Sequence, residues 1–317
     1  MTSPHPVSSS TCSPGGSVHP RSPRHRPQLF WSAGLLALSA CTSDNEIKAI
    51  VIENTAVITG DFDRVEESLA RNSVKHELFE GYISNAIYEP DVDPDIMNPK
   101  VESLWRGNNI DGDPLTTDYD AIFVNSGSRG LGEFVYNGVA SDDDFLLDPA
   151  INRAMFEFQV RGGVLVVSDW GYDLVESLWP EKIAFLDEDD GPDAAQAGLD
   201  DSVTAVITDP ALSANANSEV LDLQFDYSHW TVMKAVSSDV NVHLVGDVTY
   251  RDRSGQGAQT LQEVPLLVSF PAEQGRVIVS SFAWKAQNPG VTDVLLATLL
   301  AEMQVEVVAD QTAEETE

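Results

Sequence analysis

Cysteine is nearly absent from this sequence: its 317 residues include only Cys12 and Cys41. We expect no zinc site, because thiolate ligands are lacking and no two histidines are spaced i, i+4. Basic residues are also scarce, with 18 Lys and Arg against 51 Asp and Glu, for a net charge of −33. We therefore expect no nucleic-acid partner, because so acidic a surface repels a polyanion.

Long hydrophobic runs are missing as well, since no apolar stretch reaches the roughly 18 residues that a membrane-spanning helix needs. The apolar residues 29–38 follow a segment with three arginines and end in Leu38-Ser39-Ala40-Cys41. A basic segment, a short apolar core and small residues before a cysteine are typical of a bacterial lipoprotein signal. The sequence therefore predicts a signal peptide over residues 1–40 and lipidation, with palmitate, at Cys41.

Several expectations follow from this lipoprotein signal. Cys12 would leave with the signal peptide, so the mature chain would have no disulfide and no free thiol. The lipid would be the membrane anchor, with residues 41–46 as a tether that holds the domain in the periplasm. Thr42 is not the aspartate associated with inner-membrane retention. We therefore expect a cell-envelope protein, lipid-anchored in the outer membrane.

Strand and helix patterns alternate along residues 47–304, and we interpret this range as one domain followed by an acidic tail, residues 305–317. Apolar runs predict strands at residues 47–52, 76–83, 119–124 and 164–167. Asp63 and Glu66 are spaced as a capping box for a helix that buries Val65 and Leu69. Asp148, Pro149 and Gly162 are placed as N-cap, first helical residue and helix stop.

The C-terminal third has a different pattern. Strands are predicted at residues 203–208, 220–225 and 240–248, an antiparallel hairpin at 264–282, and a closing helix at 291–303. Residues 88–118 and 187–201 read as long acidic loops. The fold class is therefore α/β, with a mostly parallel, doubly wound, flavodoxin-like sheet and an antiparallel C-terminal extension.

Three short stretches carry a family resemblance: YDAIFVNSGS at residues 119–128, GVLVVSDWGY at 163–172 and GRVIVSSFAW at 275–284. They resemble the oxyanion-loop strand, the nucleophile elbow and the late strand of the class I glutamine amidotransferase-like fold, especially its ThuA-like branch. The resemblance places Asp169 where the family has its cysteine nucleophile and Ala283 or Trp284 where it has a histidine. The catalytic residues of the family are therefore missing, which implies a pseudoenzyme.

Asp169 has two other interpretations. Asp is a preferred N-cap, so its carboxylate would accept the free N–H groups of the following helix. Alternatively, Asp169 is a carboxylate nucleophile, with His229 as the candidate to activate water. Open α/β sheets bind ligands at the carboxyl ends of their strands, so a binding crevice is expected there. Its candidate residues are Ser126, Gly127, Ser128, Asp169, Trp170, Tyr172 and Trp284.

The sequence favours a non-catalytic envelope lipoprotein that binds or scaffolds, with a carbohydrate or an envelope protein as its ligand. A second hypothesis is a carbohydrate-active hydrolase or isomerase that uses Asp169. A third is a cation-binding surface protein, suggested by the acidic clusters 142–144 and 187–190 and by residues 109–113. None of these clusters has the spacing of a calcium loop, so we expect no metal and no cofactor.

Overall fold

The computed structural model describes residues 53–81, 101–128, 135–136, 139–140, 149–186, 195–200, 202–227, 229–252 and 257–303. All of them belong to the compact unit Glu46–Glu317. The expected signal peptide, Cys41, the tether and the acidic tail lie outside the described residues. None of the described helices combines the length and apolar character that crossing a membrane requires.

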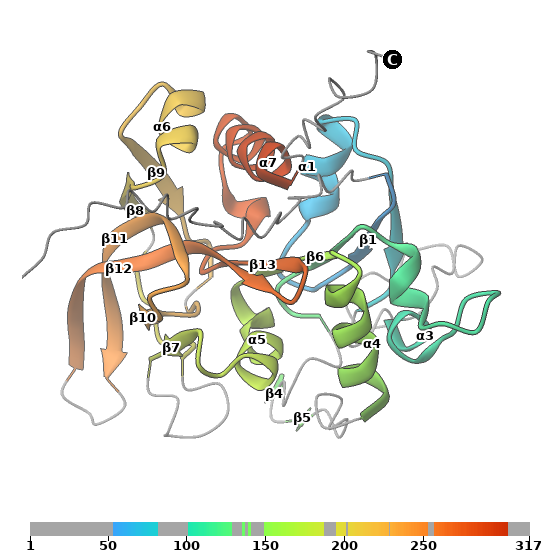
Figure 1. Ribbon diagram of the computed structural model, residues 1–317. Helices are drawn as coiled ribbons and strands as arrows, with labels where there is room; N and C mark the ends of the chain where they lie inside the picture. The colour runs from blue at the N-terminus through green and yellow to red at the C-terminus, as the bar shows by residue number, and fades with distance from the viewer. Residues whose placement is uncertain are drawn as a thin grey trace, which may run out of the picture. The chain divides into compact units, whose positions relative to one another are not determined.

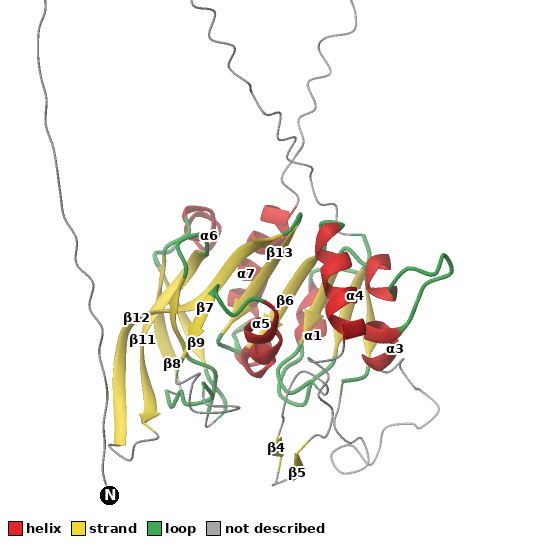
Figure 2. Cartoon of the chain, turned by 60° about the horizontal axis from the view of Figure 1, so that its bottom comes forward, coloured by secondary structure: helices red, strands yellow, loops and turns green. Residues whose placement is uncertain are grey.

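A nine-stranded mixed sheet forms the centre of the domain (Figure 2). Its parallel half contains, in spatial order, β2 (His76–Phe79), β1 (Thr55–Ile58), β3 (Ala121–Val124), β6 (Val164–Ser168) and β13 (Gly275–Ser280). Its antiparallel half adds β12 (Gly257–Ala272), β11 (Asn241–Asp252), β8 (Ser202–Ile207) and β9 (Val220–Gln224). The expectation of an α/β fold with an antiparallel extension is confirmed. Taken in chain order, the parallel strands have the flavodoxin-like order 2-1-3-4-5.

Helices cover both faces of the sheet (Figure 1). One face packs against α1 (Val65–Arg71), α6 (Pro210–Ala216) and α7 (Pro289–Met303). The other packs against α3 (Val101–Arg106), α4 (Pro149–Val160) and α5 (Tyr172–Leu178). Successive residues of β1 enter opposite cores, Val57 one and Ala56 and Ile58 the other. This burial on both faces explains why the central strands are continuous apolar runs rather than alternating ones.

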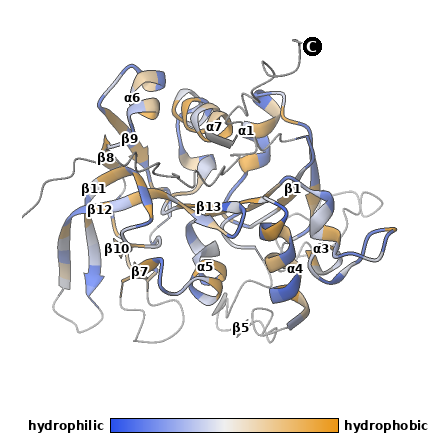
Figure 3. Cartoon of the chain, in the orientation of Figure 1, coloured by the Kyte–Doolittle hydropathy of each residue, from blue (hydrophilic) through white to orange (hydrophobic). Residues whose placement is uncertain are grey.

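Several short elements connect or flank these layers. They are the strand pair β7 (Ile183–Phe185) with β10 (Met233–Val236), the pair β4 (Val135–Tyr136) with β5 (Val139–Ala140), and the 3₁₀ turns η1 (Leu115–Asp118), η3 (Asp169–Gly171) and η5 (Trp284–Ala286). In Figure 3, α4 carries both hydrophobic and hydrophilic residues, as an amphipathic helix does, whereas α7 is mostly hydrophobic.

The structure corrects some of the sequence predictions. A helix, α3, lies within the predicted loop 88–118, because Val101, Leu104 and Trp105 form one buried helical face. The strand β1, only four residues long, was not predicted, and the predicted strand 47–52 lies outside the described residues. The helices after Arg64 and at Pro149 are confirmed, as is the closing helix.

The capping box expected at Asp63 is absent. Arg64 occupies the N-cap position of α1, and its side chain makes no capping hydrogen bond. Instead Asn125, from the loop after β3, accepts a hydrogen bond from the Val65 backbone N–H at 3.3 Å. The Asn125 amide also donates to Glu66 at 2.8 Å. The start of α1 is thus capped by a residue of a neighbouring strand, which leaves the Asp63 side chain available for other contacts.

Candidate functional site

Three loops converge at the carboxyl edge of the parallel strands, following β1, β3 and β6. The loops after β1 and β3 are joined by backbone hydrogen bonds from Asp61 to Gly127 at 3.3 Å and from Phe62 to Ser126 at 3.1 Å. Strand order reverses between β1 and β3, and ligands bind at such a switch point in open α/β sheets. The topology therefore favours this edge as the candidate functional site.

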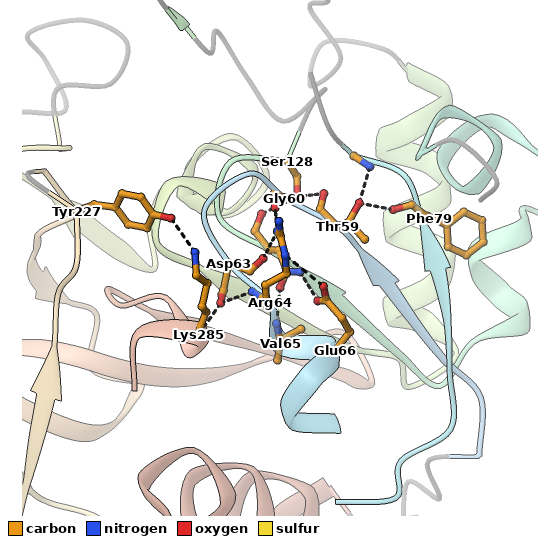
Figure 4. Close-up of polar contacts among 12 residues, drawn as sticks. Thr59, Gly60, Asp63, Arg64, Val65, Glu66, Phe79, Ser128, Tyr227 and Lys285 are labelled. Carbon is orange, nitrogen blue, oxygen red and sulfur yellow. Dashed lines mark hydrogen bonds and ion pairs between the residues drawn. The ribbon is translucent and has the colours of Figure 1, made fainter. Parts of the chain in front are cut away.

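Gly127 is needed where these two loops meet. Its φ of +77° lies in the left-handed region, and a Cβ at this position would stand 2.6 Å from the Phe62 ring. Both conditions exclude other residues without a shift of the loop. Ser128, one residue on, donates to the Asn125 carbonyl at 2.6 Å and lies 3.1 Å from the Thr59 carbonyl (Figure 4). The small residues after β3 thus shape a tight loop.

Asp169 begins the sharp turn after β6, which we call the elbow (Ser168–Gly171). Its φ is +42°, a left-handed conformation that is strained for a residue with a Cβ. The interpretation of Asp169 as a helix cap is wrong, because neither η3 nor α5 has a side-chain capping bond. Its carboxyl group instead accepts the Thr231 backbone N–H at 2.8 Å and the Ser126 hydroxyl at 3.2 Å. The side chain therefore connects the elbow to two other segments.

Asp63 is a second buried carboxyl group at the same edge, and the sequence analysis did not single it out as a site residue. It accepts a hydrogen bond from the Ser168 hydroxyl at 2.6 Å. It also accepts the backbone N–H of Lys285 at 2.9 Å (Figure 4). The Ser168 oxygen in turn accepts the Ser126 N–H at 3.0 Å. Ser168 and Ser126 therefore join the two acids into one polar network at the ends of β1, β3 and β6.

Burial raises the pKa of both acids. For Asp63, removal from water raises the pKa to about 6, while hydrogen bonds from Ser168 and from the backbone of Lys285 partly oppose the shift. For Asp169, burial raises the pKa to about 8 against hydrogen bonds from Thr231 and Ser126. The negative charge of Asp63 adds to the increase at Asp169. At pH 7, Asp169 is thus mostly protonated and Asp63 mostly ionised.

Three rings next to this network form what we call the aromatic cover: Phe62, which precedes Asp63, Trp170, which follows Asp169, and Tyr227. Phe62 makes edge contacts with Trp170 at 4.8 Å and with Tyr227 at 4.9 Å between ring centroids. All three rings are half-buried, whereas Asp169 is only 2 % exposed. Lys285 is exposed beside the cover and donates to the Tyr227 hydroxyl at 3.4 Å (Figure 4).

Two residues expected in the crevice lie in the cores instead. Tyr172 is 2 % exposed and packs against Phe185, with ring centroids 4.9 Å apart. Trp284 is 1 % exposed and packs against Phe282 in the opposite core. Ser126, Gly127, Ser128, Asp169 and Trp170 do gather at the carboxyl edge. Of the three aromatic residues expected in the crevice, Trp170 is half-buried and the other two are buried. The sequence analysis did not predict Phe62 and Tyr227 as part of the site.

His229 contributes its backbone to the site, since its carbonyl accepts the Trp170 indole N–H at 3.2 Å. Burial lowers the pKa of its imidazole, and the positive charge of Arg251 lowers it further. The contact between His229 and the elbow thus runs through its backbone, and activation of water by its imidazole stays a prediction.

The described residues contain no group of three or more His, Cys, Asp or Glu side chains arranged to hold a metal ion. In residues 109–113, the Asn109 side chain accepts the backbone N–H groups of Asp111 and Asp113, each at 3.0 Å. Asp113 also forms an ion pair with Arg161 at 2.6 Å. The turn at residues 109–113 is thus held in place by hydrogen bonds among its own residues and by the ion pair with Arg161. The acidic clusters 142–144 and 187–190 lie outside the described residues.

Comparisons with known proteins give matches at the level of structure. No protein-family model matches the chain, and no curated protein matches its sequence. Similar solved structures include a cytoplasmic protein from Salmonella typhimurium, with 12% identity, a TM-score of 0.45, and coverage of 79% of this chain and 98% of the other. A putative ThuA-like protein from Parabacteroides merdae has 11% identity, a TM-score of 0.44, and coverage of 81% and 92%.

The PurLQS structure from Thermotoga maritima is similar over 80% of this chain and 100% of that chain, with 11% identity and a TM-score of 0.42. Similarities of this size concern the fold and carry no argument about chemistry. The site is therefore interpreted below from its own residues.

Proposed function

We propose that this chain is an envelope lipoprotein, anchored through Cys41, whose amidotransferase-like domain binds a ligand and does not transfer acyl groups. The observation that carries the proposal is that the Asp169 side chain is buried and fully hydrogen-bonded. It occupies the elbow, yet it is 2 % exposed and its two carboxyl oxygens are engaged by Thr231 and Ser126. A nucleophile must instead present an accessible, activated atom to the substrate.

The protonation of Asp169 supports the same proposal. A carboxyl group attacks only as the anion, and burial that raises its pKa to about 8 keeps Asp169 mostly neutral at pH 7. Its hydrogen bonds hold together the elbow, the loop after β3 and the segment before β10. Because Asp169 is buried and engaged in these hydrogen bonds, the ligand would contact the aromatic cover rather than the acid itself.

The aromatic cover suits a carbohydrate ring or an envelope protein. Half-buried rings offer apolar faces and edges, and the exposed ammonium group of Lys285 stands at their border. Both ligand classes are consistent with these groups. The acidic character of the whole chain disfavours polyanionic ligands.

The proposal is tested by a thermal-shift screen of the purified protein against disaccharides, cell-wall fragments and divalent ions, followed by calorimetry on any hit. Trp170→Ala should weaken binding at least about tenfold, since stacked aromatic contacts often dominate such sites. Trp179→Ala is the matched control, because Trp179 packs against Phe270 in the core on another part of the fold. Equal loss in both variants would contradict a binding role for the cover.

A second candidate function is acid–base catalysis on a carbohydrate. It is favoured by one observation, the pair of buried acids whose pKa values of about 6 and about 8 lie on either side of neutrality. A screen on glycosides, esters and amides distinguishes the two functions. Turnover by the wild type that disappears in a folded Asp169→Asn variant would favour the enzyme and refute the binding-only proposal.

A further inference from the structure

A pocket of about 370 Å³ lies on the opposite edge of the sheet from the elbow. It is lined by residues of the β8–α6 connection, of the start of β11 and of the start of β13: Thr208, Asp209, Pro210, Asn241, Val242, His243 and Arg276. Arg276 pairs with Val164, the first residue of β6, so the pocket is at the amino edge of the parallel strands. Its volume lies at the lower end of the roughly 300–1,000 Å³ typical of ligand sites.

A β-bulge turns His243 into this pocket. The register of β11 against β12 shifts between Val242 and Leu244, and these two residues pack against opposite cores. In a regular strand their side chains would point to the same face of the sheet. Bulges re-aim single side chains in this way and occur frequently next to binding and active sites.

Two hydrogen bonds fix the imidazole of His243. Its Nδ1 is 2.6 Å from a carboxylate oxygen of Asp209, and its Nε2 is 2.8 Å from the Ser269 hydroxyl. A carboxylate only accepts, so Nδ1 carries the proton and Nε2 accepts from Ser269 in the neutral ring. The other oxygen of Asp209 accepts the N–H groups of Ala211 and Leu212 at the start of α6.

The order Asp209, His243, Ser269 is that of a serine hydrolase triad, but Ser269 does not qualify as a nucleophile. It is 0 % exposed and lies in the middle of β12, paired on one side with β11 and on the other with β13. It is also absent from the pocket wall. A substrate carbonyl would not reach its hydroxyl. The hydrogen bonds among Asp209, His243 and Ser269 instead fix the positions of Asp209 and His243 in the wall of the pocket.

The charges on that wall are one of each sign. Arg276 contributes a guanidinium group and Asp209 a carboxylate, while burial lowers the pKa of His243 and keeps the ring neutral at pH 7. Asp209 raises that pKa and Arg276 lowers it, as expected when both groups face the imidazole. Pro210 and Val242 add apolar surface. The acidic chain as a whole disfavours a net anion, and Arg276 disfavours a net cation.

We infer that this pocket binds a small zwitterion of the amino-acid class, with its carboxylate at Arg276 and its ammonium group at Asp209. Arginine binds carboxylates through paired N–H donors, and a carboxylate accepts hydrogen bonds from an ammonium group. Asn241 lines the same pocket and supplies an amide for the ligand's polar atoms. The inference does not depend on the function proposed for the elbow.

The test is calorimetry of the purified wild-type protein at pH 7 against each of the twenty protein amino acids. At least one should bind, and its N-acetyl and carboxamide derivatives should bind at least about tenfold more weakly, since each removes one charged contact. Arg276→Gln and Asp209→Asn should each reduce affinity by a similar factor, and asparagine still caps α6. Arg153→Gln, an exposed change on α4, is the matched control.

The wild-type measurements alone can overturn the inference, even if a variant fails to fold. If no amino acid binds at millimolar concentration, the pocket has no such ligand. If acetate or ethylamine binds as tightly as the best amino acid, the site recognises a single charge and not a zwitterion. Undiminished binding by a folded Arg276→Gln variant would place the ligand elsewhere.

Discussion

Replacement of Asp169 by asparagine should stabilise the protein at neutral and alkaline pH. In the folded chain the pKa of Asp169 is about 8, whereas in the unfolded chain it returns to its ordinary value of 3.8. Between these values the unfolded state releases a proton that the folded state retains. The contribution of Asp169 to stability is therefore fully present below about pH 4 and is lost as the pH rises toward 8.

The magnitude follows from the shift. At pH 7, about three pH units above the unfolded-state pKa of 3.8, ionisation of Asp169 stabilises the unfolded state by roughly 4 kcal/mol. Asparagine has the shape of the neutral acid and does not ionise, so the unfolded variant is not stabilised in this way. Its Oδ1 accepts the Thr231 N–H, as an oxygen of Asp169 does. Its amide replaces the oxygen that accepts from Ser126, so the Ser126 hydroxyl must turn to accept instead of donating. One amide hydrogen lacks a partner, which costs about 1–3 kcal/mol. The expected net gain is about 1–3 kcal/mol.

The assay is urea unfolding of wild type and Asp169→Asn at pH values from 6.5 to 8. The difference in unfolding free energy between the two proteins isolates Asp169, because every other titrating group is common to both. This difference should grow by up to about 1.4 kcal/mol per pH unit below pH 8. Asp120→Asn is the control, since Asp120 accepts two backbone N–H bonds at the opposite edge.

An Asp169→Asn variant that is less stable than wild type at pH 7 and keeps the wild-type slope would refute this reasoning. It would mean that Asp169 is ionised in the folded protein, with its charge stabilised by groups not considered above. The nucleophile interpretation would then regain support, because the anion would be present at neutral pH.

Three further predictions follow from other parts of the chain. Gly127→Ala should destabilise the protein by about 1–3 kcal/mol in thermal or urea unfolding, because its φ of +77° and the Phe62 ring leave no place for a methyl group; an unchanged unfolding midpoint would contradict the strain. Cys41→Ala should abolish membrane association and labelling by a palmitate analogue, and labelling of the variant would disprove the lipoprotein signal. Calorimetry should detect no stoichiometric calcium site tighter than about the millimolar range; micromolar binding would revive the cation hypothesis.

The sequence by itself determined most strands of the large sheet, several helices and the position of the elbow. Residues 163–172 combine an apolar run, a turn and a helical segment, and local pattern is sufficient to recognise that order. The alternation of strands and helices also fixed the fold class, because parallel strands need helical crossovers. The short elements β1 and α3 were not predicted, because four to six residues are too few to show the hydrophobic periodicity of a strand or a helix.

Only the tertiary structure decided which side chains share the site. Asp63 and Asp169 are far apart in the chain and meet through Ser168, and no spacing rule relates them. Trp170 is half-buried at the edge whereas Tyr172, two residues later, is buried in the core. A bulge in β11, which no local pattern of the sequence indicates, turns His243 toward Asp209 and Ser269. Local sequence fixes the backbone pattern, whereas the pairing of distant strands and its irregularities determine which residues meet.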